Sequence, residues 1–300
     1  MRLILPAVFL VDVRTARKNR IRQLLALPRP VEGALATYTR GQLTGFIFQP
    51  SDGSEQILIV PIKAKSLPDN QAFIIGGNVD TSLSTVDLSA GIWLRRPLHT
   101  VTGNQCEALQ EVVTSWRGAF TYTQEDPSQD LQGLRAPQLG ALHAIHAHWA
   151  VSSEPATIVM PTGTGKTETM LSILLSAQCP KVLVIVPTDA LRIQIAEKFI
   201  TLGILKKPDV SVLKPSAMFP LVCILEHIPL DAAEVDDLFE RTHVIVTTSS
   251  IVGQCAEETQ KRFAHHSPYL FIDEAHHAVI VAVSNRLNPS IGRTRCLMRR

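Results

Sequence analysis

The stretch Thr157-Ile-Val-Met-Pro-Thr-Gly-Thr-Gly-Lys-Thr167 decides the fold of this chain. It begins with a short β-branched run over 157–160, and apolar residues at helical spacing follow it over 166–177. A glycine-rich turn between a strand and a helix lets successive backbone N–H groups point at phosphate oxygens, and the helix N-terminus adds its positive dipole end. The stretch therefore predicts a phosphate-binding loop.

The polar residues of this loop have distinct tasks in holding a triphosphate with its magnesium ion. Lys166 is expected to reach the β- and γ-phosphates, and the Thr167 hydroxyl is expected to ligate Mg²⁺. The full pattern G-x-x-x-x-G-K-[ST] requires glycine at position 160, where this chain has Met160. The expected nucleotide-binding residues of the loop are Gly163, Thr164, Gly165, Lys166 and Thr167.

A second signal, Asp273-Glu274-Ala-His276, comes directly after the apolar run 269–272. An acid at the carboxyl end of a buried strand in an open α/β sheet faces the crevice in which ligands bind. Asp273 is expected to hold Mg²⁺, and Glu274 to accept a proton from the attacking water. The two signals together predict a site that binds ATP and hydrolyses it, with Lys166, Asp273 and Glu274 as its catalytic residues.

The chain changes its hydrophobic pattern near residue 130. Before that point, short apolar runs at 43–48 and 57–62 are separated by a turn signal, which predicts a hairpin within a smaller β-rich α+β domain over 1–130. After a polar linker at 122–133, continuous apolar runs alternate with helical segments over 134–278, which is typical of a parallel sheet covered by helices. The tail 279–300 has no such strand and helix rhythm.

Composition excludes several classes of protein. Of 300 residues 45% are hydrophobic and 19% charged, as expected for folded domains and not for collagen-like or low-complexity chains. The apolar stretch 3–11 is far shorter than the ~20 residues of a membrane span, so we do not expect this chain to be an integral membrane protein. Five cysteines without a CxxC pair indicate reduced thiols and a cytoplasmic location.

Positive charge is concentrated at both ends of the chain. Residues 1–30 hold seven Lys/Arg and one acid, and 279–300 hold five Arg and no acid, so that the middle is net acidic although the whole chain carries +2. Attraction to nucleic acid would therefore have to come from local patches. The basic segment 14–22 is expected to form a solvated helix face, and contact with phosphates is the alternative.

With these motifs the chain resembles the DEAD/DEAH-like helicases of superfamily 2, in the group of restriction-enzyme translocating subunits and excision-repair-type helicases. The resemblance covers about residues 134–278. It rests on Met160-Pro-Thr-Gly-Thr-Gly-Lys-Thr167 and on Phe271-Ile-Asp-Glu-Ala-His-His277. Weaker matches are found at 186–194, 246–249 and 135–138.

The resemblance implies a RecA-like ATP-binding lobe that uses ATP and Mg²⁺. It implies that Gln138 recognises adenine, that His276 couples the ATP site to strand binding, and that the nucleic-acid backbone is contacted by Thr247, Thr248 and Ser249. The alternative for these three residues is capping of the helix that follows them, because hydroxyl side chains favour that position. For Gln138 the alternative is an exposed residue near a helix start.

The resemblance also implies a second lobe with an arginine finger, and the chain ends 27 residues after Asp273. We therefore expect the N-terminal part of an ATP-dependent helicase or translocase on nucleic acid, with DNA favoured over RNA. A truncated or frame-shifted chain is one explanation for the missing second lobe, and a partner protein that supplies this lobe is the other. One alternative is an ATP-binding interaction module without turnover. Another is a P-loop kinase or metabolic ATPase, for which Asp-Glu-Ala-His has no reason to appear.

Overall fold

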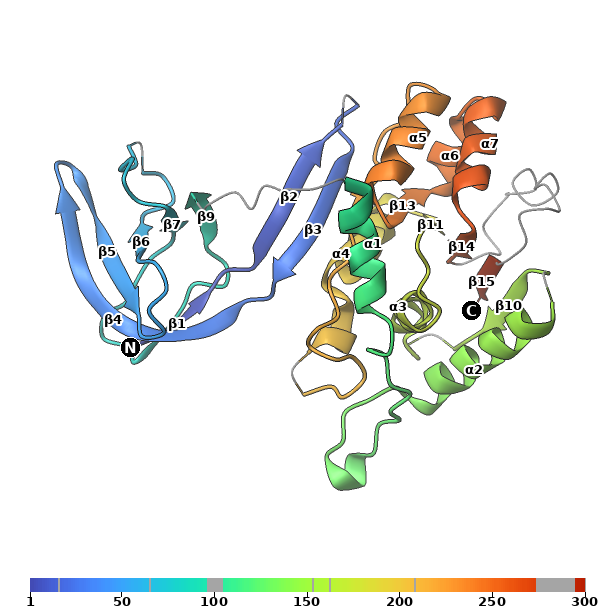
Figure 1. Ribbon diagram of the computed structural model, residues 1–300, viewed down its shortest axis with the longest axis horizontal. Coiled ribbons are helices and arrows are strands. Elements are labelled where there is room, and N and C mark those ends of the chain that lie inside the picture. Colours follow the sequence, from blue (N-terminus) through green and yellow to red (C-terminus); the bar gives the residue numbers. More distant parts are fainter. Residues whose placement is uncertain are drawn as a thin grey trace. The chain divides into compact units, whose positions relative to one another are not determined.

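The computed structural model describes residues 1–15, 17–64, 66–95, 105–152, 154–161, 163–207, 209–273 and 295–299. Contacts divide the chain into two compact units (Figure 1). Residues 1–10 and 24–100 form the first unit, and residues 11–23 and 101–300 form the second. This division differs from the expected boundary near residue 130.

The first unit contains a seven-stranded mixed sheet within its described residues. In spatial order its strands are β8 (Thr85–Asp87), β1 (Arg2–Leu5), β4 (Arg29–Arg40), β5 (Leu43–Pro50), β6 (Ile57–Val60), β7 (Phe73–Gly76) and β9 (Ile92–Arg95). The predicted hairpin is confirmed, since β5 and β6 pair antiparallel. Ile57 and Ile59 of β6 enter one apolar cluster and Leu58 and Val60 another, because successive side chains of a strand alternate between its faces.

The second unit is built on an eight-stranded sheet in the described part of the chain, and six neighbouring strands of it run parallel. In spatial order the strands are β10 (Ala156–Val159), β15 (Arg295–Arg299), β14 (Tyr269–Ile272), β11 (Val182–Val186), β13 (Val244–Thr248), β12 (Val222–Ile224), β3 (Arg20–Ala26) and β2 (Val8–Arg14). Strands β11 and β13 are buried along their whole length, as their continuous apolar sequences predict.

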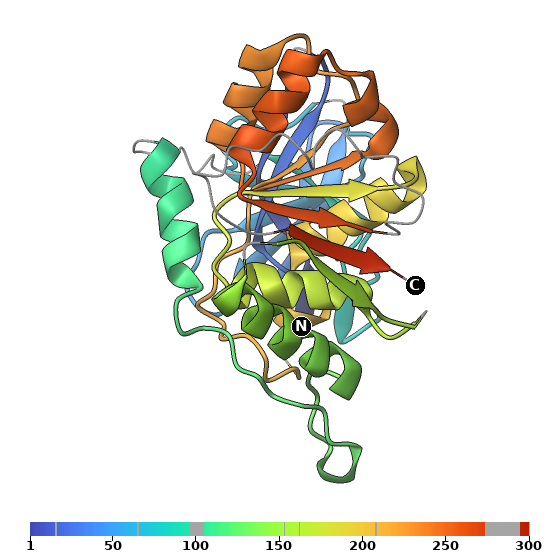
Figure 2. The same cartoon turned by 90° about the vertical axis from the view of Figure 1, so that its right-hand side faces the viewer.

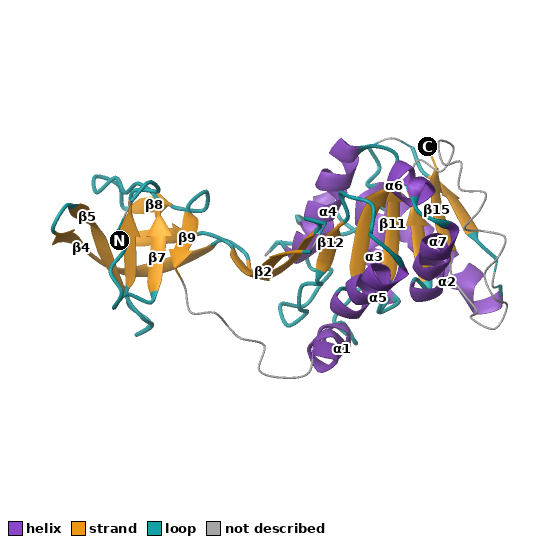
Figure 3. Cartoon of the chain, turned by 90° about the horizontal axis from the view of Figure 1, so that it is seen from above, coloured by secondary structure: helices purple, strands orange, loops and turns teal. Residues whose placement is uncertain are grey.

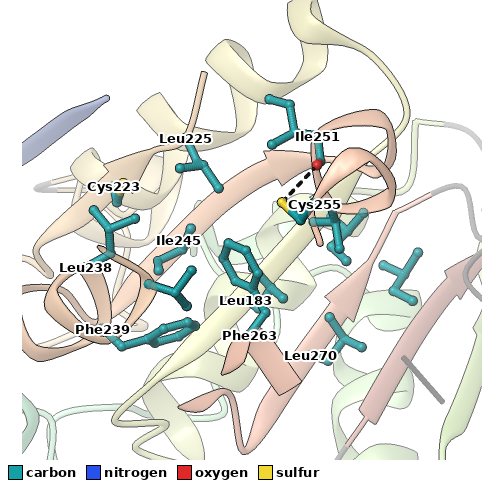
Figure 4. Close-up of a cluster of buried hydrophobic side chains, with 14 of the residues drawn as sticks. Leu183, Cys223, Leu225, Leu238, Phe239, Ile245, Ile251, Cys255, Phe263 and Leu270 are labelled. Carbon is teal, nitrogen blue, oxygen red and sulfur yellow. Dashed lines mark hydrogen bonds between the residues drawn. The ribbon is translucent and has the colours of Figure 1, made fainter. Parts of the chain in front are cut away.

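Helices cover this sheet (Figure 3). They are α1 (Gln105–Ser115), α2 (Ala136–Val151), α3 (Lys166–Ser176), α4 (Asp189–Thr201), α5 (Ala232–Arg241), α6 (Ser249–Gln254) and α7 (Glu257–His266). Leu183 and Ile245 of the sheet pack against Leu238, Phe239 and Phe263 of the helices in one buried cluster (Figure 4). The expected α/β fold, a RecA-like parallel sheet with flanking helices, is confirmed.

One prediction about the N-terminal end of the chain is wrong. The basic segment 14–22 is part of a hairpin and not a helix, and β3 pairs antiparallel with β12. Ile21 enters the buried cluster while Arg20 and Arg22 lie on the other face, so the period is that of a strand. Within the tail 279–300, β15 pairs in parallel with β10 and β14 (Figure 2).

The segment expected to be a linker lies against the second unit. The backbone N–H of Thr121 donates to Val212 O at 2.8 Å, and Gln132 forms a bridge with Val210. Leu134 at its end is fully buried. These contacts explain why 105–133 groups with the second unit rather than with the first.

Candidate nucleotide-binding site

The candidate site lies at the carboxyl edge of the second sheet. Because the strands are parallel, the loops that follow β10, β11, β13 and β14 all leave the sheet at this edge, where open α/β sheets bind ligands. Asp273 follows β14 directly, and its backbone N–H donates to Ile185 O at 2.9 Å. One strand, β15, separates β14 from β10, which leads into the phosphate loop.

The phosphate loop has the backbone that its glycines predict. Gly163 and Gly165 have φ of +80° and +88°, which side chains other than glycine rarely adopt. Between them, the Thr164 hydroxyl donates to Pro161 O at 2.6 Å and closes a tight turn. Lys166 is the first residue of α3 and Thr167 the second, so both side chains leave from the positive end of the helix dipole.

Gln138 and Arg135 support this loop from the start of α2. The Gln138 side chain is 2% exposed, and its Nε2 donates to Gly165 O at 3.3 Å while its Oε1 accepts from the Arg135 backbone N–H at 2.8 Å. Arg135 Nη1 donates to Gly163 O at 3.0 Å. Gln138 is therefore buried and not an exposed residue of a helix start, and its amide positions the loop.

The part that Arg135 has in this support was not predicted from the sequence. The available signal was a polar residue with glutamine three positions later at the start of an apolar helix, which is the spacing of reciprocal N-terminal capping. A second missed contact is the ion pair between Glu168 of α3 and Lys198 of α4, which joins the helix of the phosphate loop to its neighbour.

Met160, the departure from the full loop pattern, is a core residue. Its side chain is 2% exposed, and the Thr169 hydroxyl lies 3.6 Å from its sulfur. The side chain at this position therefore points into the lobe and packs there.

Gly165→Ala is expected to weaken ATP binding by at least about tenfold. An added Cβ would lie 2.0 Å from Gln138 Nε2, so the Gln138 amide must leave Gly165 O, and a side chain at this φ costs ~1–3 kcal/mol. The matched control is Gly118→Ala, which has φ +64° and open space around the added Cβ. Calorimetric titration with ATP checks this, and equal affinities for both variants would contradict the support role of Gln138.

The three residues expected to contact nucleic acid differ in exposure. Thr247 is fully buried and donates to Leu225 O at 3.5 Å. Thr248 is 3% exposed and caps α6 by accepting from the Ile251 N–H at 3.4 Å, which is the capping alternative. Ser249, at the start of α6, is half-buried, so it is the only one of these three residues that is partly accessible to solvent.

The predicted residues Glu274 and His276 lie outside the described residues.

Comparison with known proteins agrees with this geometry. A family model described as type III restriction enzyme, res subunit, matches residues 132–288, which is just over half of the chain. No curated protein matches the chain. Among the described residues no helix is long and apolar enough to cross a membrane.

Proposed function

Because the chain belongs to the type III restriction enzyme res subunit family of helicase-like, ATP-dependent enzymes, we propose that it binds Mg²⁺-ATP and couples ATP hydrolysis to contact with DNA. The observation that carries the proposal is the phosphate loop. Gln138 and Arg135 donate hydrogen bonds to the carbonyl oxygens of its two positive-φ glycines. The loop lies at the same edge of the sheet as Asp273.

The donor set suits a magnesium site. Thr167 offers a hydroxyl at the start of α3, and Asp273 offers a carboxylate at the end of β14 and is only 9% exposed. Oxygen ligands of this kind are those that Mg²⁺ takes together with nucleotide phosphates. When bound there, the ion would neutralise charge on the phosphates.

The chain's own groups account for the rest of the proposed reaction. Backbone N–H groups of the loop, the Lys166 ammonium and the α3 dipole stabilise the negative charge of the triphosphate. Gln138 keeps the loop in this conformation and, in the proposal, also contacts adenine. Glu274 accepts a proton from the water that attacks the γ-phosphate, and His276 couples this event to nucleic acid.

DNA is the proposed nucleic acid because the matching family is one of restriction enzymes. Ser249, at the same edge as the phosphate loop, supports contact with the nucleic-acid backbone, which carries no sequence information. Cys223 and Cys255 are buried thiols, which supports the reducing environment of the cytoplasm.

The proposal is tested by ATP hydrolysis with and without single-stranded and duplex DNA. Hydrolysis that DNA stimulates supports it. ATP binding without hydrolysis under every condition would instead support an interaction module. Transfer of phosphate to a small acceptor would support a kinase.

Glu274→Gln is expected to retain ATP affinity and to lower hydrolysis at least about 100-fold, because the amide keeps the size of the side chain but cannot accept a proton. The matched control is Glu258→Gln in the exposed first turn of α7, which should hydrolyse ATP at the wild-type rate. A Glu274→Gln variant as fast as wild type would remove Glu274 from the mechanism.

A further inference from the structure

The turn of the β2–β3 hairpin lies at the carboxyl edge of the second sheet. Because β3 is antiparallel to β12, with Arg20 opposite Ile224, the start of β3 lies beside the end of β12. Residues 17–19 precede that start directly. They therefore lie at the same edge of the sheet as the phosphate loop and Ser249. In the strand order, β10 is at one end of the sheet and the hairpin is at the other.

Asn19 holds this turn in place. Its side chain is fully buried, and Oδ1 accepts from the backbone N–H groups of Glu226 and His227, both at 2.8 Å. Its Nδ2 donates to His227 O at 3.3 Å, and its backbone N–H donates to the Thr15 hydroxyl at 3.1 Å. The turn is thus bonded at several points to the loop after β12.

The basic residues of the hairpin fall into two groups. Arg20 makes two hydrogen bonds to Glu226, at 2.8 and 3.0 Å, and Arg22 pairs with Glu197 of α4. These two charges are used to attach β3 to the lobe. Arg17 and Lys18 are exposed, and within the described residues neither makes an ion pair.

Lys18 also has a backbone conformation that lysine does not favour. Its φ is +65°, in the left-handed region where a side chain costs ~1–2 kcal/mol. Glycine would remove this cost. A lysine here is thus not explained by the turn itself, whereas an external ligand for its ammonium group would explain it.

We infer that the exposed side of this turn, residues 17–19, is a phosphate-contacting element of the second unit, in which Arg17 and Lys18 bind the backbone of a nucleic-acid strand lying along the carboxyl edge. This inference rests on the proposed function. The turn stands two strands from β13, roughly 10 Å at ~4.8 Å per strand. One nucleotide of B-DNA rises ~3.4 Å along the helix axis, so a strand contacting Ser249 would reach the turn within about three nucleotides or fewer.

The test compares Arg17→Ser/Lys18→Gly with a control that removes two lysines elsewhere. The control, Lys207→Ser/Lys214→Ser, changes net charge equally at two exposed residues in the segment between α4 and β12, which leads to the amino edge of the sheet. The probes are fluorescein-labelled oligo(dT) and oligo(rU) of about 20 nucleotides, titrated at about 50 to 200 mM salt. ATP affinity and thermal unfolding are measured for every variant.

We expect the hairpin variant to bind the oligonucleotides about tenfold more weakly, with the slope of log K against log salt reduced by about 1.4 for two lost contacts, and the control to bind within about twofold of wild type. ATP affinity should not change, and unfolding should occur at the same or a higher temperature. Wild-type affinity and salt slope in the hairpin variant, or an equal loss in the control, would overturn the inference alone. A wild-type chain that binds neither oligonucleotide would overturn the proposed function with it.

Discussion

Lys166→Ala is expected to weaken ATP binding by about 10–100-fold. The lysine begins α3, where its ammonium group adds to the helix dipole and to the N–H groups of the glycine turn. A charge-assisted hydrogen bond contributes ~1.5–3 kcal/mol, and each 1.4 kcal/mol is a factor of ten in affinity. Calorimetric titration of the full chain with Mg²⁺-ATP measures the effect directly.

The matched control for this variant is Lys261→Ala. Lys261 lies on α7, its side chain is 61% exposed, and it pairs with Glu257 one turn earlier at 2.9 Å. Removing it changes net charge by the same amount and should leave ATP affinity at the wild-type value. If Lys166→Ala bound ATP as tightly as the control, the phosphate-loop assignment would have to be abandoned.

The elements around the phosphate loop were predictable because their signals are local. A β-branched run ending at a glycine turn, as at 157–165, specifies a strand and its exit within a dozen residues. The same holds for the run before Asp273. The burial and capping of Thr248 follow from its place at the end of a buried strand, and the sequence left that alternative open.

The hairpin could not be predicted in the same way, because the interactions that form it are distant in sequence. Arg20 pairs with Glu226 across 206 residues, and Asn19 bonds to His227 across 208. Arginine and leucine also favour helices intrinsically, and pairing with β12 overrides that preference. In β15 the apolar run between Arg295 and Arg299 is three residues, too short to indicate a strand.

His243 is another residue whose role depends on distant contacts. It is 1% exposed, it lies directly before β13, and both nitrogens of its ring form hydrogen bonds. Nδ1 accepts from the Leu221 N–H at 3.0 Å, so Nε2 carries the proton that bonds to Leu109 O of α1 at 2.9 Å. The neighbouring Trp116 donates to Met218 O at 2.8 Å. A neutral imidazole therefore joins α1 to the sheet.

Acid is expected to destabilise the second unit through this residue. Burial lowers the pKa of His243 from 6.5 to about 4, and Lys181 opposes the added charge as well. Between these values the unfolded chain binds the proton and the folded chain does not, so stability is complete above pH 6.5 and is lost as pH falls toward 4. Over the whole window the loss amounts to ~3 kcal/mol.

His243→Asn separates this contribution from those of other titrating groups. Asparagine can still accept from the Leu221 N–H, it stays neutral at every pH, and it loses the bond to Leu109 O. We therefore expect a variant that is less stable at pH 7.5 but loses ~3 kcal/mol less than wild type when urea unfolding is repeated near pH 4. The control His227→Asn changes an exposed ring and should keep the wild-type pH dependence. If His243→Asn loses as much stability in acid as wild type does, the acid sensitivity comes from other groups and α1 is not joined to the sheet by a neutral His243.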